Sequence, residues 1–218
     1  MLVEERMKHP VLTITPDVPV QDALSRMKRD KVHRYPVVDK RGKVLGIVTD
    51  TDLLNASPSE ATTLSVWEIS ALLSKITVER VMSKTIFSVS EDSTIEEAAR
   101  IMVDHRIGGL PVMREDKLVG IITETDLFNI FLEMLGARSA GVRVTVEVED
   151  LPGKLSDLTE AIQNLGGNIN GMGAIQGESS ETRAVTLKVA GVELTALKNA
   201  LAPLVQKIVD IREEKGNA

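Results

Sequence analysis

The sequence predicts a mixed α and β protein in which two copies of a β-α-β-β-α unit precede one β-α-β-β-α-β unit. Three observations support this fold class. The first two thirds of the chain repeat with an offset of about 75 residues. Residues 142–149 then alternate strictly between apolar and polar, as in a half-buried strand. The composition, 43% hydrophobic and 27% charged over 218 residues, is that of globular protein and allows more than one domain.

The repeat places one unit at residues 1–60 and a second at 78–135. A linker and a predicted helix over 65–74 occupy the intervening residues 61–77. Matching residues stay in register along both units, apart from one deletion before the last strand. They include Met7 and Met82, Asp17 and Asp92, Ala23 and Ala98, Met27 and Met102, Pro36 and Pro111, Gly46 and Gly120, Thr49 and Thr123, and Asp52 and Asp126. This number of matches in register indicates an internal duplication.

Each unit is predicted to begin with a short strand, at 11–14 or 86–89, followed by a helix. In the first unit Pro19 presets the backbone for that helix. In the second unit Ser93 or Thr94 opens it, with Glu96 and Glu97 placed to complete a capping box. Strands at 35–38 and 44–48, or 110–113 and 118–122, then lead to a closing helix from about Thr51 or Thr125.

The third unit is predicted over residues 141–213. Its first strand ends in the turn Asp150-Leu151-Pro152-Gly153, and a helix follows with apolar residues on one face until Gly166-Gly167. Further strands are expected from Asn168 to 175, at 184–189 and at 208–211. A helix interrupted by Pro203 precedes the last of them. This order of elements is ferredoxin-like.

Composition excludes several classes of function. The chain has no cysteine, so disulfides, zinc–thiolate sites and cysteine nucleophiles cannot form. The net charge is −6 with no basic stripe, and aromatic residues make up 2%, which argues against a nucleic-acid partner. No apolar run could span a membrane and the first residues are polar, so we expect a cytoplasmic protein. The histidines at 9, 33 and 105 show no metal-ligand spacing.

A Gly-h-h-Thr-x-x-Asp motif, where h is apolar, ends at Asp52 and again at Asp126. It stands where a strand enters a helix. The helix N-terminus favours phosphate, the threonine offers a hydroxyl, and the aspartate can accept hydrogen bonds from ribose hydroxyls. The same Thr-x-x-Asp pattern is also a capping box, which stabilises a helix by about 1 kcal/mol without any ligand. Both interpretations stay open, and the aspartate in both copies favours a ligand.

The duplicated pattern around Pro36-Val37-Val38 and Gly46 to Asp52, with its copy, resembles a pair of CBS domains. The resemblance implies an adenine nucleotide, of the AMP, ADP or ATP type, as a regulatory ligand, with no required cofactor, no metal and no catalysis. Thr49 and Thr123 would meet phosphate, and Asp52 and Asp126 would meet ribose. Arg34 and Arg106 would neutralise phosphate, with His33 and His105 assisting. The residues it places beside the two bases are Thr13, Ile14, Tyr35 and Pro36, and Ser88, Val89, Leu110 and Pro111.

The motif Asp150-x-Pro152-Gly153, followed by Gly166-Gly167-Asn168-Ile169, resembles an ACT domain. By that resemblance Asp150, Leu151, Pro152, Gly153, Asn168 and Ile169 would bind an amino acid, or the domain would pair with a second copy. The other interpretation is that these residues only form turns. The whole arrangement resembles bacterial accessory proteins linked to acetoin metabolism. We therefore expect a ligand-sensing regulatory homodimer acting on an unknown effector protein, and the alternative is a homodimeric scaffold that binds no ligand.

Overall fold

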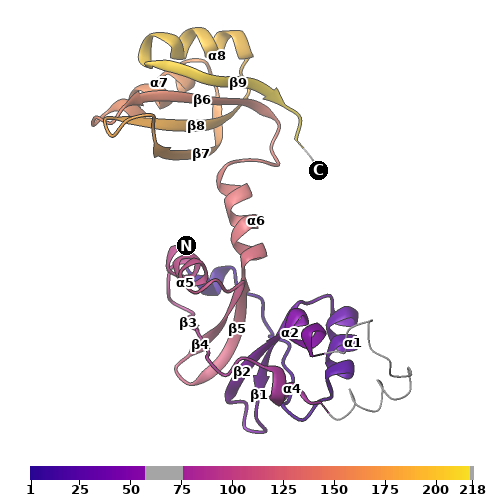
Figure 1. Cartoon of the computed structure of the whole chain (residues 1–218). Coiled ribbons are helices and arrows are strands. Elements are labelled where there is room, and N and C mark those ends of the chain that lie inside the picture. Colours follow the sequence, from indigo (N-terminus) through magenta and orange to yellow (C-terminus); the bar gives the residue numbers. More distant parts are fainter. Residues whose placement is uncertain (57–75, 217–218) are drawn as a thin grey trace. The chain divides into compact units, whose positions relative to one another are not determined.

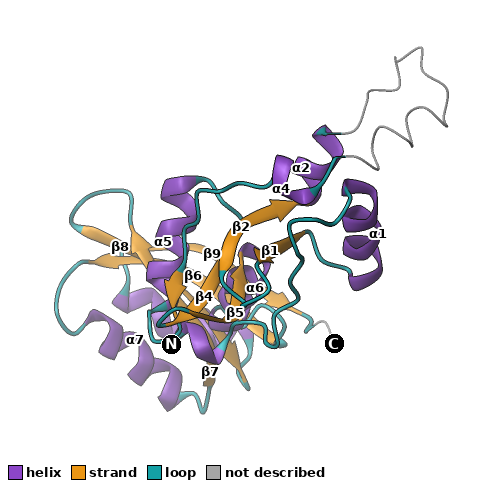
Figure 2. Ribbon diagram, turned by 90° about the horizontal axis from the view of Figure 1, so that it is seen from below, coloured by secondary structure: helices purple, strands orange, loops and turns teal. Residues whose placement is uncertain are grey.

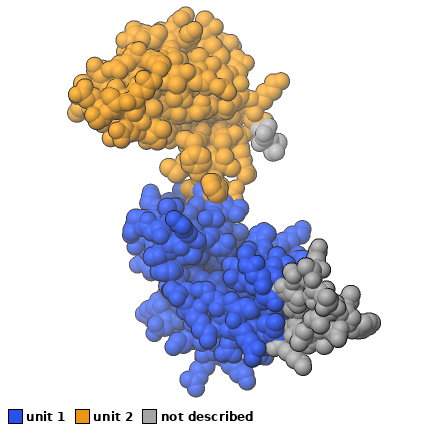
Figure 3. Space-filling view, in the orientation of Figure 1, with its two compact units in different colours: residues 1–127 blue, residues 128–218 orange. Residues whose placement is uncertain are grey.

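The computed structural model describes residues 1–56 and 76–216. The chain divides into two compact units, Met1–Leu127 and Phe128–Ala218, coloured separately in Figure 3. The predicted helix over 65–74 lies outside the described residues. Among the helices within the described ranges, none is both long enough and apolar enough to cross a bilayer.

The first unit contains both copies of the duplicated fold, and Figure 1 shows their elements. The first copy comprises η1 (Val3–Glu5), α1 (Val20–Asp30), β1 (Arg34–Val38), β2 (Val44–Thr49) and α2 (Asp50–Asn55). The second comprises α4 (Val78–Val81), β3 (Val89–Ser90), α5 (Ile95–His105), β4 (Gly109–Arg114), β5 (Lys117–Thr123) and α6 (Glu124–Met134). Residues 128–134 of α6 belong to the other compact unit.

The predicted first strand of each copy is shorter than expected. In place of a strand over 11–14, only Ile14 forms a bridge, to Val37. The reason is burial, since Ile14 is buried while Leu12 and Thr13 are exposed. In the second copy the expected strand over 86–89 is reduced to β3, which pairs in parallel with β4.

The helix beginnings show how local sequence sets the elements. Helix α5 begins after Thr94, whose Oγ1 accepts a hydrogen bond from the Glu97 N–H at 3.2 Å, so Thr94 rather than Ser93 is the N-cap. Helix α1 begins after Pro19, which stands at the N-cap with φ −61°. Helices α1 and α2 lie beside the β1–β2 hairpin (Figure 2), and apolar residues from all four elements form one core.

The second unit has the predicted β-α-β-β-α-β order. It comprises β6 (Gly141–Glu149), α7 (Lys154–Asn164), β7 (Asn168–Gln176), β8 (Thr182–Ala190), α8 (Leu194–Leu201), the short η2 (Ala202–Leu204) and β9 (Lys207–Glu214). The antiparallel sheet has the order β7-β8-β6-β9. The predicted interruption at Pro203 is the single turn η2.

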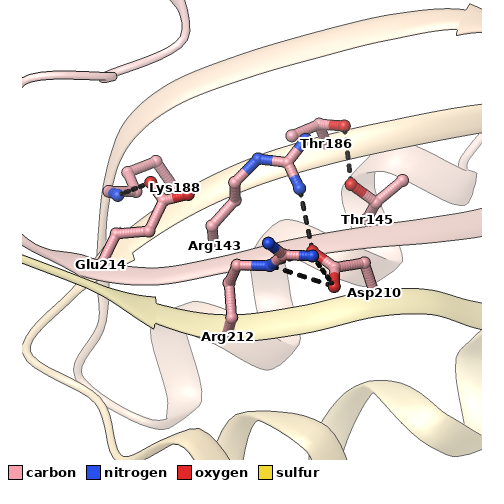
Figure 4. Close-up of polar contacts among 7 residues, drawn as sticks. All are labelled: Arg143, Thr145, Thr186, Lys188, Asp210, Arg212 and Glu214. Carbon is pink, nitrogen blue, oxygen red and sulfur yellow. Dashed lines mark hydrogen bonds and ion pairs between the residues drawn. The ribbon is translucent and has the colours of Figure 1, made fainter.

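The two faces of this sheet differ because side chains alternate along each strand. The even-numbered valines of β6 are buried with apolar residues of α7 and α8, the helices that cover one face in Figure 1. The polar side chains of β6, β8 and β9 interact with one another, as Figure 4 shows. Arg143 pairs with Asp210 at 3.0 Å, and Lys188, whose side chain is 2% exposed, pairs with Glu214.

Candidate functional site

The first strand-to-helix corner is a closed capping box. Thr49 is the N-cap of α2, and its backbone N–H and its Oγ1–H donate to Asp52 Oδ2 at 2.8 and 2.6 Å. The Asp52 N–H returns a hydrogen bond to Thr49 Oγ1 at 3.2 Å. The capping interpretation is thus satisfied by one carboxylate oxygen. Among the described residues, Asp52 Oδ1 has neither a hydrogen bond nor an ion pair.

The second corner repeats the two hydrogen bonds that the threonine donates, but among the described residues it lacks the return bond from the aspartate N–H, and its other carboxylate oxygen is engaged. The Thr123 N–H and Oγ1–H donate to Asp126 Oδ2 at 2.9 and 2.5 Å. The other oxygen, Asp126 Oδ1, is paired with Lys8 Nζ at 3.1 Å. The Asp126 side chain is only 10% exposed, so this pair occupies the group that a ribose would need. The two corners are therefore chemically unequal.

Each corner faces a cavity whose other wall comes from the opposite repeat. The first cavity, of about 270 Å³, is lined by Arg34, Ile47, Thr49, Asp52, Ser83, Thr85, Phe87, Arg106, Ile107, Gly108 and Gly109. The second cavity, of about 130 Å³, is lined by Lys8, Lys31, Val32, His33, Arg34, Gly108, Ile121, Thr123, Glu124 and Thr125. The first cavity is thus the larger, and it contains the aspartate with an unused oxygen.

Strand register explains why Arg34 reaches both cavities. In the β1–β2 hairpin Arg34 is opposite Thr49, and in the β4–β5 hairpin Gly109 is opposite Thr123. Arg34 and Gly109 are thus equivalent positions of the duplication. The Arg34 side chain lies across the backbone of Gly108 and Gly109, where a Cβ atom on residue 108 would be 2.5 Å from Arg34 Nη2. Only the absence of side chains at these glycines leaves space for the guanidinium.

The electrostatics of Arg34 are those of a cation held away from bulk water. Its guanidinium forms no hydrogen bond or ion pair with any residue of 1–56 or 76–216. Burial lowers the pKa of Arg34, and the nearby carboxylates of Glu124 and Asp50 act in the opposite direction. Such a group gains from an anion that supplies hydrogen-bond acceptors at short range.

His33 is committed to a different contact. Its Nδ1 is 2.8 Å from Asp50 Oδ2, and the His33 side chain is 82% exposed. This hydrogen bond is the main cause that holds the pKa of Asp50 below its usual value. His105 stacks on Phe87, with ring centroids 3.7 Å apart. The structure therefore places His33 in the wall of the second cavity and His105 behind a wall of the first.

The residues expected beside the bases lie mostly in the core. Thr13 is exposed and Ser88 lines a separate groove between the hairpin tips. Neither of the two cavities above is lined by any of the eight, and six of them are buried: Ile14, Tyr35, Pro36, Val89, Leu110 and Pro111. Tyr35 is 2% exposed and its hydroxyl donates to Asp30 at 2.7 Å. Their expected contact with a base has no support in this geometry.

Sequence reasoning also missed several cavity residues. Phe87, Ile47 and Ile107 supply the apolar wall of the first cavity, and Lys8 and Lys31 line the second. Lys31 could have been found from the sequence, because it is equivalent in the duplication to Arg106, which was predicted to contact phosphate. Both follow a helix in the left-handed conformation, with φ +55° and +53°. Lys8 had none, because it reaches Asp126 only through the packing of the two repeats.

The residues proposed for an amino acid in the second unit are largely engaged locally. Asp150 pairs with Arg183 at 3.0 Å, and Asn168 Nδ2 donates to Asn170 Oδ1 at 2.9 Å. Ile169 packs against the core of the sheet. Leu151, Pro152 and Gly153 form an exposed turn, with Gly153 at φ +94° as the N-cap of α7. Within the described parts of the chain, no cluster of three His, Asp or Glu side chains is arranged to hold a metal.

Two unequal cavities, each between a Thr-x-x-Asp corner and the opposite repeat, define a module of two paired repeats. The chain belongs to the CBS domain family. The CBS domain model matches residues 3–59 and 78–133, and a TTHA0829-like ACT domain matches residues 140–212. This confirms the predicted CBS pair and ACT domain.

Several solved structures are similar to the first two thirds of this chain. A protein from Vibrio cholerae assigned to acetoin utilization, AcuB, is 33% identical with a TM-score of 0.52, covering 62% of this chain and 93% of that one. CBSX2, solved in complex with AMP, is 26% identical with a TM-score of 0.52, covering 61% and 97%. The CBS pair of MJ0100, in complex with 5′-methylthioadenosine and S-adenosyl-L-methionine, is 25% identical with a TM-score of 0.51, covering 60% and 99%.

Proposed function

We propose that this protein is a non-catalytic sensor that binds an adenine nucleotide in the first cavity, beside Thr49 and Asp52. The observation that carries the proposal is the free oxygen of Asp52. The capping box uses Oδ2 alone, and Oδ1 stands in the wall of a cavity of about 270 Å³. A carboxylate with an available oxygen can accept hydrogen bonds from both hydroxyls of a ribose.

The remaining walls suit the other parts of a nucleotide. Phe87, Ile47 and Ile107 offer apolar surface to a base, while Arg34 and Arg106 offer positive charge to a phosphate. The bound ligands of CBSX2 and of the MJ0100 pair all contain adenosine, which supports adenine as the base. The first cavity is favoured as the tighter site because one oxygen of Asp126 is already paired with Lys8, which makes the second cavity the weaker site.

The test is AMP binding by calorimetry to the full chain and to two matched variants. Asp52→Ala and Asp126→Ala each remove the carboxylate that accepts from the N-terminal threonine, so each should lose about 1 kcal/mol of unfolding free energy. Asp126→Ala also removes the ion pair with the exposed Lys8, which adds little to that loss. Only Asp52→Ala should abolish tight AMP binding. Equal loss in both variants, or wild-type protein that binds no adenine nucleotide, would refute the assignment.

Further roles of the chain are proposed on separate grounds. Exposed apolar side chains on α6, Phe128 at 67% and Phe131 at 56%, support self-association as a homodimer. The similarity to AcuB supports a regulatory link to acetoin metabolism. An amino-acid ligand of the ACT domain, an effector protein and a cytoplasmic location rest on the sequence expectations alone.

The second candidate, a homodimeric scaffold without a ligand, is favoured by the hydrogen bonds that each aspartate already accepts from its own threonine. In each pair the threonine N–H and hydroxyl donate to the aspartate without any bound molecule. This candidate predicts that size-exclusion chromatography with light scattering gives a dimer and that AMP changes neither the mass nor the melting temperature.

A further inference from the structure

Arg34 and Gly108 are the two residues that line both cavities. The guanidinium of Arg34 lies over the Gly108–Gly109 backbone, and Nη1 and Nη2 would be 3.0 and 2.5 Å from a Cβ on residue 108. A single cationic side chain thus forms the wall between the two sites.

The duplication makes this arrangement asymmetric. The position equivalent to Arg34 in the second repeat is Gly109, so the second repeat contributes no cation to the shared wall. The other basic residues are divided between the cavities: Arg106 lines the first, while Lys8 and Lys31 line the second. Lys8 is already paired with Asp126, and Glu124 adds negative charge to the second cavity.

We infer that the two cavities compete for Arg34, so that an anionic nucleotide bound in the first cavity weakens binding of an anionic nucleotide in the second. This inference rests on the proposed nucleotide function and adds the coupling between its two sites.

The coupling follows from the chemistry of the guanidinium. A bidentate pair with a phosphate uses two parallel N–H groups on one edge of its plane and neutralises its charge. A second phosphate on the opposite side then meets a neutralised arginine and the negative charge of the first phosphate at short range. Hydrogen bonds to charged groups are strong enough for the loss of this contact to weaken the second event by about tenfold or more.

The experiment measures AMP binding to the second cavity with the first cavity filled and with it disabled. In the wild type this is the second binding step in calorimetry. Asp52→Asn keeps an oxygen for the capping hydrogen bonds but turns an amide nitrogen toward the ribose, which disables the first cavity. Binding to the second cavity is then the only step that calorimetry measures in this variant. We expect the single step of Asp52→Asn to be about tenfold tighter than the second step of the wild type.

The coupling ratio is the Kd of the second wild-type step divided by the Kd of the single step in Asp52→Asn. Arg34→Met, which keeps the length of the stem without its charge, should lower the coupling ratio measured in its own background severalfold, to the part that repulsion between the two phosphates contributes. The same comparison in Arg26→Met, an exposed arginine of α1 that lines neither cavity, should keep the wild-type ratio. 5′-Methylthioadenosine has no phosphate. With this ligand the second step of the wild type and the single step of Asp52→Asn should therefore have about the same affinity. Melting temperatures without ligand verify that each variant is folded.

Several results overturn the inference. A ratio near one in the wild type, an unchanged ratio in Arg34→Met, or no AMP binding to folded Asp52→Asn would each show that Arg34 does not couple two sites. If AMP still binds the wild type and depends on Asp52, the proposed function stands while the coupling fails. If the wild type binds no AMP, both fail.

Discussion

The Arg34 guanidinium lies over Gly109, with Nη1 2.9 Å from the position that a Cβ atom on residue 109 would take. The two residues are equivalent positions of an internal duplication, one with the longest cationic side chain and the other with none. The two related corners differ in a second way as well: the first faces a larger cavity with a free aspartate oxygen, and the second faces a smaller cavity with its aspartate paired to Lys8. The function proposed for the chain depends on that asymmetry.

A methyl group at Gly108 should displace the Arg34 guanidinium. The new Cβ would lie 2.5 Å from Arg34 Nη2 and 2.9 Å from Glu124 Oε2, both at the ends of flexible side chains. Gly108→Ala should therefore weaken AMP binding about tenfold and change unfolding free energy by less than about 1 kcal/mol. Calorimetry and chemical denaturation measure the two quantities. A large loss of stability would show that the glycine is needed for the backbone instead.

Phe87→Ala should remove a wall of the first cavity that every adenine ligand would use. Stacking of a base on an aromatic ring contributes about 1–3 kcal/mol, so affinity should fall about tenfold or more. The loss should be the same for AMP and for 5′-methylthioadenosine, because the two ligands share the base. Phe128→Ala, at a side chain 67% exposed, is the control and should leave both affinities unchanged.

Tyr35 is the one tyrosine of the chain, so absorbance at 295 nm reports its ionisation alone. Burial and the hydrogen bond to Asp30 raise the pKa of Tyr35 above its ordinary value. The stability from this group is complete below the unfolded pKa of about 10 and is lost as pH rises from there toward the folded pKa. We expect no ionisation near pH 10 in the folded protein, and Tyr35→Phe should lack this alkaline loss of stability. A midpoint near pH 10 without unfolding would contradict the buried position.

The Lys188–Glu214 pair of the ACT domain should respond unequally to removal of its two partners (Figure 4). The Lys188 side chain is 2% exposed and that of Glu214 is 35% exposed. Glu214→Gln leaves an ammonium buried without a countercharge, which should cost about 2 kcal/mol or more of unfolding free energy. Lys188→Met leaves a carboxylate that water can reach and should cost less. Denaturation of the full chain, followed through the ACT domain transition, gives the comparison, and an equal or reversed order would contradict it.

Much of this architecture could be predicted from the sequence, because the patterns that indicate it are local or occur twice. The register of Thr49-x-x-Asp52 with Thr123-x-x-Asp126 identified both corners. The full capping box forms at the first corner, and the threonine donates to the aspartate at both. The alternating valines of β6 and the helical spacing of α7 and α8 placed the apolar face of the second sheet. The first strand of each CBS repeat was overestimated, and in the first repeat Leu12 is exposed although it lies two residues before the buried Ile14.

What local pattern could not reveal is which residues of one repeat face the corner of the other. Arg106 to Gly109 line the same cavity as Thr49, and Lys8 pairs with Asp126, across separations that no short period describes. Tyr35 and Leu110 have side chains that could pack against a base, but both are buried in the core. Burial of apolar area is the larger contribution to free energy when a strand packs. The chain's own order of residues thus established the duplication, the corners and the domain types. Which aspartate keeps a free oxygen and which is paired depends on the packing of the two repeats. Only that packing brings Arg34 onto Gly109 and Lys8 onto Asp126.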